Sequence, residues 1–300
     1  MKNFYAKVDS YNQTTYDTNT LSVLLKDDTR KTLRIDENAK VIEGEVYYFE
    51  CEPTEFKGKE QYLVSTFTHI TDLNLSLEDE QEAMRYFYNY SPETTKQTKA
   101  IIENALNSIE NPTILAITKD LYETYKAQYY RYPAATRFHH AYIGGVAHHT
   151  ATMLKLVEGF VQTYPFLNQD LLNGGIILHD LFKIIELSNH YAPEYTKEGR
   201  LIGHIAMGVE YIGFSAKKLS LYETEERLLM QHMVLSHHYY GNFGSPKKPN
   251  IPEALALHFI DNIDSKFAVL GQALEHTKLG EFTSSLGVLD RERYYKSKLK

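Results

Sequence analysis

The second half of the chain concentrates the residue types that bind metal ions. Eleven of the 13 histidines fall between His139 and His258. Imidazole nitrogens and carboxylate oxygens are ligands for divalent transition metals. In chain order the candidate ligands are His148-His149, His179-Asp180, His204, His237-His238, and Asp261 with Asp264. They stand near expected helix ends or on apolar stripes, where an ionisable group is costly without a partner, so we expect them to converge on one metal centre.

Two aspartates give the strongest evidence for a metal centre. Asp180 and Asp261 each interrupt an apolar run, where an unpaired carboxylate would be strongly destabilising. A single His-Asp dipeptide would be weak evidence, because chance supplies such pairs often. Three other histidines are explained as well by structural roles, and we leave them out of the predicted site: His232, His258 and His276.

Helices must position these side chains, because apolar residues recur at helical spacing after Thr71. Pro92 and Pro112 mark helix starts. The expected helices cover residues 77–89, 92–109, 112–130, 142–163, 169–187, 202–218, 223–236 and 252–275. The metal-binding residues therefore belong to an all-α region.

The first 75 residues have a different pattern. Five short segments rich in β-branched and aromatic residues alternate with turn-formers such as Lys57-Gly58-Lys59. No helical period separates them, which favours a small closed barrel over a βαβ unit. The expected strands are Asn3–Asp9, Thr20–Lys26, Lys31–Ile35, Glu45–Glu52 and Glu60–Phe67. Residues 1–80 carry 9 Lys/Arg and 16 Asp/Glu, whereas residues 81–300 carry 23 of each.

Composition excludes several classes of protein. With 43% hydrophobic and 24% charged residues, the 300-residue chain is an ordinary globular protein rather than a disordered or fibrous one. Its sole cysteine, Cys51, cannot form a disulfide within the chain. The first residues lack the apolar core of a signal peptide, and no apolar run is long enough to span a membrane. These features predict a cytoplasmic protein with no membrane partner.

The same residues carry a resemblance to known enzymes. The order His, His-Asp, Asp along a helical region resembles the HD phosphohydrolase superfamily, and the additional His204 and His237-His238 resemble its branch that binds two metals. Seven segments are similar to the YhaM family of bacterial exoribonucleases. They are Pro133–Ala135, His139–Ala141, Gly144–Thr150, Gly175–Leu181, Gly203–Ile205, Gln231–His238 and Phe259–Lys266.

The resemblance implies a multidomain α and β fold. An N-terminal OB-like β-barrel for nucleic-acid binding or assembly would cover residues 1–75, a helical connector 76–130, and an all-α HD domain 131–300. The implied activity is removal of nucleotides from the 3′ end of single-stranded RNA, with single-stranded DNA as a second substrate and nucleoside 5′-monophosphates as products. The family favours manganese, sometimes cobalt, and iron or magnesium stay open. A homo-oligomer is also implied.

Carried over residue by residue, the resemblance implies a set of metal ligands. They are His149, His179, Asp180, His204, His237, His238 and Asp261. His149 is preferred over His148 because the family's ligand directly precedes the position of Thr150. Two positions depart from the family pattern: Phe182 replaces a glycine before Lys183, and Tyr239-Tyr240 replaces Gly-Lys after the paired histidines.

A two-metal mechanism suits this set. Two divalent ions about 3.5–4 Å apart can clamp a phosphodiester and activate the attacking water, and the two oxygens of Asp180 suit it to bridge them. Lys183 follows Asp180 by three residues, so on a helix it shares its face and can neutralise phosphoryl charge. Asp264, one turn after Asp261, is expected to orient a ligand.

Candidate substrate contacts are less defined. His140, Lys247 and Lys248 could touch substrate, although a turn cap or a solubilising loop explains them equally well. The acidic barrel lacks the basic surface that usually binds phosphates, so stacking on aromatic rings would have to supply affinity. Its candidate rings are Tyr47, Tyr48, Phe49, Phe56 and Tyr62, of which alternate ones must face the core.

Two other functions stay open. The ligand set alone cannot select a substrate, so a phosphohydrolase of small nucleotides or cyclic dinucleotides is one alternative. The second is a nucleic-acid-binding factor whose metal is structural. The preceding barrel favours a polymeric substrate, and a site for two ions favours catalysis.

Overall fold

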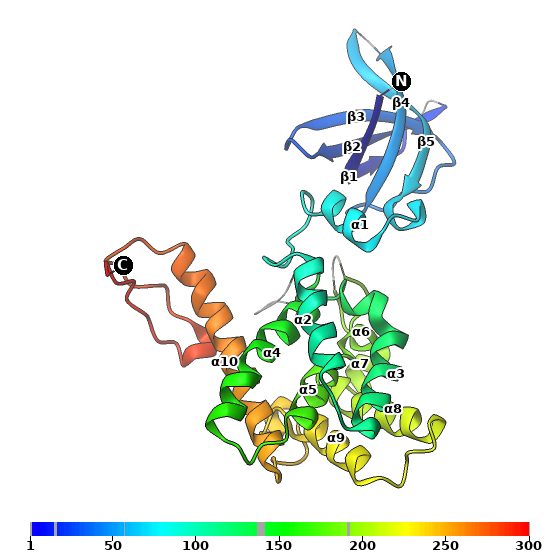
Figure 1. The fold of residues 1–300 in the computed structure, drawn as a ribbon. Coiled ribbons are helices and arrows are strands. Elements are labelled where there is room, and N and C mark those ends of the chain that lie inside the picture. Colours follow the sequence, from blue (N-terminus) through cyan, green and yellow to red (C-terminus); the bar gives the residue numbers. More distant parts are fainter. Residues whose placement is uncertain (1, 15–16, 57, 137–141, 191–192, 300) are drawn as a thin grey trace. The chain divides into compact units, whose positions relative to one another are not determined.

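A computed structural model describes residues 2–14, 17–56, 58–136, 142–190 and 193–299 (Figure 1). The chain forms two compact units, Met1–Asn89 and Tyr90–Lys300. Among the described residues, no helix combines the length and apolar character needed to cross a membrane.

The first unit contains the predicted barrel. Five strands close in the order β1-β2-β3-β5-β4, with β3 and β5 parallel and the other pairs antiparallel. Their bounds are β1 Lys2–Asn12, β2 Thr18–Leu25, β3 Arg30–Asp36, β4 Val46–Phe56 and β5 Lys59–His69. The short η1 (Ile70–Leu73) and α1 (Leu77–Met84) complete the unit. The prediction of an OB-like barrel is confirmed.

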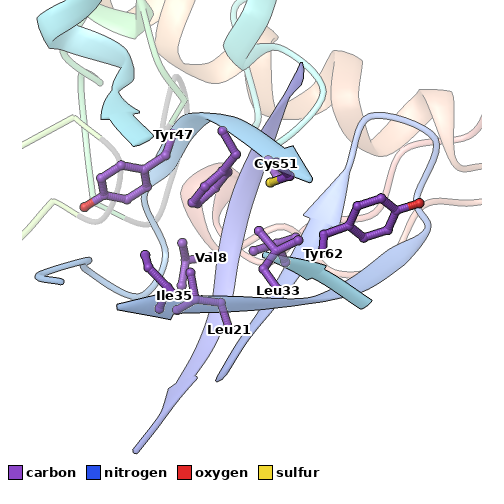
Figure 2. Close-up of a cluster of buried hydrophobic side chains, with 10 residues drawn as sticks. Val8, Leu21, Leu33, Ile35, Tyr47, Cys51 and Tyr62 are labelled. Atoms are coloured by element: carbon purple, nitrogen blue, oxygen red, sulfur yellow. The ribbon is translucent and has the colours of Figure 1, made fainter. Parts of the chain in front are cut away.

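Side-chain alternation along the strands builds the barrel core. Figure 2 shows inward-facing side chains from all five strands, among them Val8, Leu33 and Cys51. Three of the aromatic residues considered for base stacking belong to this core, because Tyr47 and Tyr62 are 5% exposed and Phe49 is fully buried. They are therefore unavailable to nucleobases. Tyr48 is half-buried against Tyr5, and the Phe56 side chain lies outside the described residues.

The second unit is helical, as predicted. Its α-helices are α2 Thr95–Asn107, α3 Pro112–Tyr129, α4 Gly145–Thr163, α5 Gln169–Leu178, α6 Lys183–Glu186, α7 Lys197–Leu201, α8 His204–Lys218, α9 Glu225–Ser236 and α10 Pro252–Glu275. The 3₁₀-helices are η2 Gly241–Phe243 and η3 Gly287–Leu289. Helix α1 belongs to the first unit, whereas α2 and α3 pack within the second.

Helix α5 occupies the centre of this unit. It contacts α2, α3, α4, α9 and α10, and every residue from Leu171 to Leu178 is buried. From Leu171 to Leu178 all its residues except Asn173 are apolar or glycine, and a segment this apolar requires such surroundings. The prediction of one helix over 169–187 was wrong, because α5 ends at Leu178. Hydrogen bonds of the 3₁₀ type, from Leu181 N to Leu178 O and from Lys183 N to Asp180 O, form a tight turn before α6.

Candidate metal centre

The turn after α5 places His179 and Asp180 in the core, and four other helices bring further candidate ligands to them. His149 lies on α4, His204 is the first residue of α8, and His237 caps the end of α9, where His238 follows. Asp261 and Asp264 lie one turn apart on α10. All the expected ligands except His238 and Asp261 are buried.

Asp180 lies between two groups of histidines. Its Oδ1 is 3.3 Å from His204 Nε2 and 3.8 Å from His237 Nε2. Its Oδ2 is 3.4 Å from His179 Nε2 and 3.9 Å from His149 Nε2. Two sets of ligand atoms, each within 4.8 Å of one another, could hold a metal ion: Asp180, His204, His237 and His238, and His149, His179 and Asp180. The shared carboxylate therefore presents one oxygen to each set.

Four imidazoles are oriented with Nε2 toward this centre, because their other ring nitrogen is bonded elsewhere. His179 Nδ1 donates to the carbonyl of Ile176 and His237 Nδ1 to that of Val234, both at 2.7 Å. His149 Nδ1 contacts Asp264 Oδ2 at 2.6 Å, and His204 Nδ1 contacts Glu186 Oε2 at 3.0 Å. Such outer partners fix the tautomer and the ring orientation of a metal-binding histidine.

Three buried atoms at the centre lack hydrogen bonds. Asp180 Oδ1, His204 Nε2 and His237 Nε2 are shielded from solvent, yet none makes a hydrogen bond within the described part of the chain. Such groups are strongly destabilising unless something binds them. A divalent cation would bind all three, because imidazole nitrogen and carboxylate oxygen are its ligands. The donor set therefore fits a metal ion.

Burial and neighbouring charges favour the metal-binding forms of His237, His238 and Asp180. Burial lowers the pKa of His237 and His238, so both are neutral. Burial alone would raise the pKa of Asp180, but Lys183 and His179 hold it well below its usual range. His149 behaves differently: burial disfavours its charged form, yet Asp261 and Asp264 outweigh that effect and raise its pKa to about 10.

Of the other predicted site residues, some lie at the centre, some are exposed on a loop, and one lies outside the described residues. Asp261 Oδ1 is 3.2 Å from His149 Nε2, and Lys183 Nζ is 2.6 Å from Asp180 Oδ2. Lys247 and Lys248 are exposed on the loop after α9, and neither is among the ion pairs of the described centre. His140 lies outside the described residues.

Glu186, which the sequence analysis did not single out, completes the environment of His204. Its Oε1 accepts a hydrogen bond from the His204 backbone N–H at 3.2 Å, and its Oε2 lies 3.0 Å from Nδ1. Burial would raise the pKa of Glu186, but the hydrogen bonds and charge of His204 lower it. Its place in Ile184-Ile185-Glu186-Leu187 was an available signal, because a carboxylate in an apolar run needs a partner.

The backbone accommodates one departure from the family pattern, Phe182, and is strained at the other, Tyr239. Phe182 is fully buried, and its ring stacks on Tyr211 with centroids 4.7 Å apart. Its φ of −80° requires no glycine. Tyr239 has φ 66°, in the left-handed region that glycine adopts freely and a bulky residue rarely does.

Comparison with known proteins shows the family of this chain. The chain is 41% identical to the 3′-5′ exoribonuclease YhaM of Geobacillus sp. (strain WCH70) over 227 residues, which is 76% of this chain and 70% of that protein. It is 42% identical to the protein of the same name from Bacillus pumilus (strain SAFR-032) over 219 residues, 73% and 69% of the two chains.

A third relative, the 3′-5′ exoribonuclease YhaM of Halalkalibacterium halodurans, is 35% identical over 261 residues, 87% of this chain and 79% of its own. No family model and no solved structure matches the chain. The similarity to the three relatives covers most of each sequence, and this protein belongs to the YhaM 3′-5′ exoribonuclease family.

Proposed function

We propose that this protein is a metal-dependent 3′-5′ exoribonuclease that hydrolyses phosphodiester bonds and releases nucleoside 5′-monophosphates. Family membership supports the direction and the substrate, since the three relatives carry that activity in their names. The observation that carries the metal dependence is the carboxylate of Asp180, whose two oxygens face two separate sets of histidines.

The proposed centre would hold two divalent ions. Asp180 would bind both, with one ion also bound by His204, His237 and His238, and the other by His149, His179 and Asp261. Such ions, when bound, acidify water and stabilise negative charge on the phosphoryl oxygens. Manganese is the metal that the family resemblance favours, with cobalt, iron or magnesium as the other candidates. Carboxylate ligands suit manganese and magnesium, and imidazole ligands suit iron.

Lys183 is proposed to act on the substrate itself. Its ammonium group lies 2.6 Å from Asp180 Oδ2, and its side chain is 12% exposed. Burial would lower its pKa, but the adjacent carboxylate outweighs this effect and raises it, so the amine stays charged. A fixed positive charge in a site that excludes most water stabilises charge that develops on a phosphoryl group. Asp264 and Glu186 keep His149 and His204 in their orientations.

The barrel, residues 1–75 in the proposed division, is assigned to RNA binding or assembly. Its negative net charge disfavours phosphate binding. Its buried aromatic rings are unavailable for base stacking, so both features favour assembly. The resemblance further supports a cytoplasmic location, single-stranded DNA as a second substrate and a homo-oligomer. Light scattering after size-exclusion chromatography tests the last of these.

Replacement of Asp180 tests the proposal. Asp180→Asn should lower the rate of RNA shortening more than about 100-fold, since even partners outside the metal's own ligands cost 10–100-fold. The exposed Asp290→Asn is the matched control, because asparagine tolerates the left-handed backbone found there. Near-normal activity of Asp180→Asn would contradict the assignment.

The assay uses 5′-labelled single-stranded RNA, with products resolved over time. A ladder that shortens from the 3′ end, lost on chelation and restored by Mn²⁺, is expected. Inertness toward RNA with cleavage of cyclic dinucleotides would favour the small-nucleotide alternative. Less than one ion per chain at saturation would favour a non-catalytic factor.

A further inference from the structure

Tyr239, directly after the paired histidines, holds a backbone conformation that is costly for its type. Among the described non-glycine residues with positive φ, it is the only aromatic one. Strain of this kind persists only where the surroundings enforce it, and it is concentrated at functional sites. The contacts of the Tyr239 ring therefore indicate what the strain maintains.

Three neighbours hold the Tyr239 ring in place. Its centroid lies 4.7 Å from that of Tyr240 and 5.1 Å from that of His258. The ammonium group of Lys248 lies over the ring, 5.1 Å from its centroid. Aromatic pairs and cation–π contacts at these separations are attractive. The left-handed turn thus gathers two tyrosine rings and one lysine.

His258 connects this group to the metal centre. Its Nδ1 donates a hydrogen bond of 2.8 Å to the carbonyl of His237. His258 also precedes Asp261 by three residues on α10, and residues at that spacing lie on the same helix face. The two tyrosines therefore border the centre that the proposed function assigns to phosphodiester hydrolysis.

Two members of the group can reach a ligand. The Tyr240 side chain is 50% exposed, and Lys248 is exposed on the same loop. An exposed aromatic ring and an exposed cation that both contact Tyr239 match a single-stranded nucleotide, whose base stacks on the ring of Tyr240 while a phosphate binds the ammonium group of Lys248. Because every base has a π face, such a contact tolerates any sequence.

We propose that Tyr239, Tyr240 and Lys248 form a nucleotide platform, in which Tyr240 stacks on one nucleobase of the RNA and Lys248 binds a phosphate of the same strand. This inference rests on the proposed function, because it assigns the bound nucleotide to the strand being shortened. Tyr239 is a positioning residue whose ring supports Tyr240.

Equilibrium binding of RNA to the metal-free protein, residues 1–300, tests the platform without requiring catalysis. The probe is a fluorescein-labelled oligoadenylate, measured by anisotropy, together with a series in which one base at a time near the 3′ end is removed. Wild type should bind at least one abasic RNA more weakly than the intact RNA. Tyr240→Ala should bind the intact RNA about 5- to 150-fold more weakly, as expected for loss of one stacked base.

The decisive quantity is the coupling free energy between the Tyr240 ring and the base, obtained by comparing the effect of removing the base in wild type and in Tyr240→Ala. Tyr240→Ala should bind intact and abasic RNA alike, while Tyr240→Phe keeps the wild-type discrimination. Tyr295→Ala, equally exposed at 50% in the segment near the C-terminus, is the matched control and should bind as wild type does. Lys248→Gln should lower the slope of log affinity against log salt by about 0.7.

Discrimination against abasic RNA that persists in Tyr240→Ala would overturn the platform, as would unchanged affinity for the intact RNA. The failure of the proposed function is separate: if wild type binds RNA with the predicted coupling but does not shorten it from the 3′ end, the platform holds and the exoribonuclease assignment fails.

Discussion

Glu186→Gln probes the part of the centre that the sequence did not reveal. The Glu186 carboxylate accepts two hydrogen bonds from His204, one from its backbone N–H and one from its ring nitrogen Nδ1. Glutamine keeps the shape but has a single amide oxygen, and its amide nitrogen cannot accept a hydrogen bond. One of the two contacts must therefore be lost, and the negative charge that holds the His204 ring is lost with it.

The size of the effect follows from these contacts. A hydrogen bond to a charged group contributes about 1.5–3 kcal/mol, and each 1.4 kcal/mol is tenfold in affinity. Loss of one such bond therefore predicts roughly 10- to 150-fold weaker metal binding, which agrees with the 10–100-fold cost of removing outer partners of metal ligands. Since His204 belongs to only one of the two ligand sets, a single ion should be affected.

The assay is a calorimetric titration of Mn²⁺ into the metal-free protein. Wild type is expected to bind two ions, and Glu186→Gln should weaken one of them while leaving the other within about twofold. Glu198→Gln, at an exposed glutamate on α7, is the matched control. Circular dichroism of the metal-free variant checks that the helices are intact. Equal weakening of both ions, or none, would refute the reasoning.

Two further predictions concern packing. A Cβ added at Gly199 would overlap the carbonyl oxygen of Glu186. Gly199→Ala should therefore destabilise the helical unit by about 1–3 kcal/mol and lower its Tm by roughly 2–12 °C. An unchanged Tm in calorimetry would contradict the close approach. Cys51 is fully buried in the barrel, and burial raises the pKa of its thiol to about 11. The thiolate is the reactive form, so a disulfide reagent at pH 8 should label Cys51 only after denaturation, and rapid labelling of the native protein would disprove this.

The order of the two architectures was predictable from the sequence because it is encoded by short-range patterns. Two-residue alternation marks strands, and apolar residues at three- and four-residue spacing mark helices. The chemistry was predictable for a similar reason, since carboxylates and imidazoles in apolar runs must find partners wherever those runs pack. The need of His179, Asp180 and Asp261 for partners, which a metal ion would provide, thus follows from their immediate neighbours.

Contacts between distant elements were decided by the tertiary structure. His149 and His148 are adjacent in the chain, but only the packing of α4 against α10 brings His149 to Asp264, 115 residues away. Likewise, alternation predicted that half of the barrel's aromatic rings face inward, whereas closure of the sheet determined that Tyr47 and Tyr62 are among them.

Asp180 shows most clearly which properties the sequence determines and which the tertiary structure determines. Its sequence neighbours require a buried carboxylate to be compensated, yet they do not determine which histidines approach each oxygen. That depends on where the ends of α5, α8 and α9 meet. The residue types in this protein determine what its centre can bind, and the packing of its helices determines how many ligands reach each side, because the ligand atoms come from elements whose mutual positions no local pattern encodes.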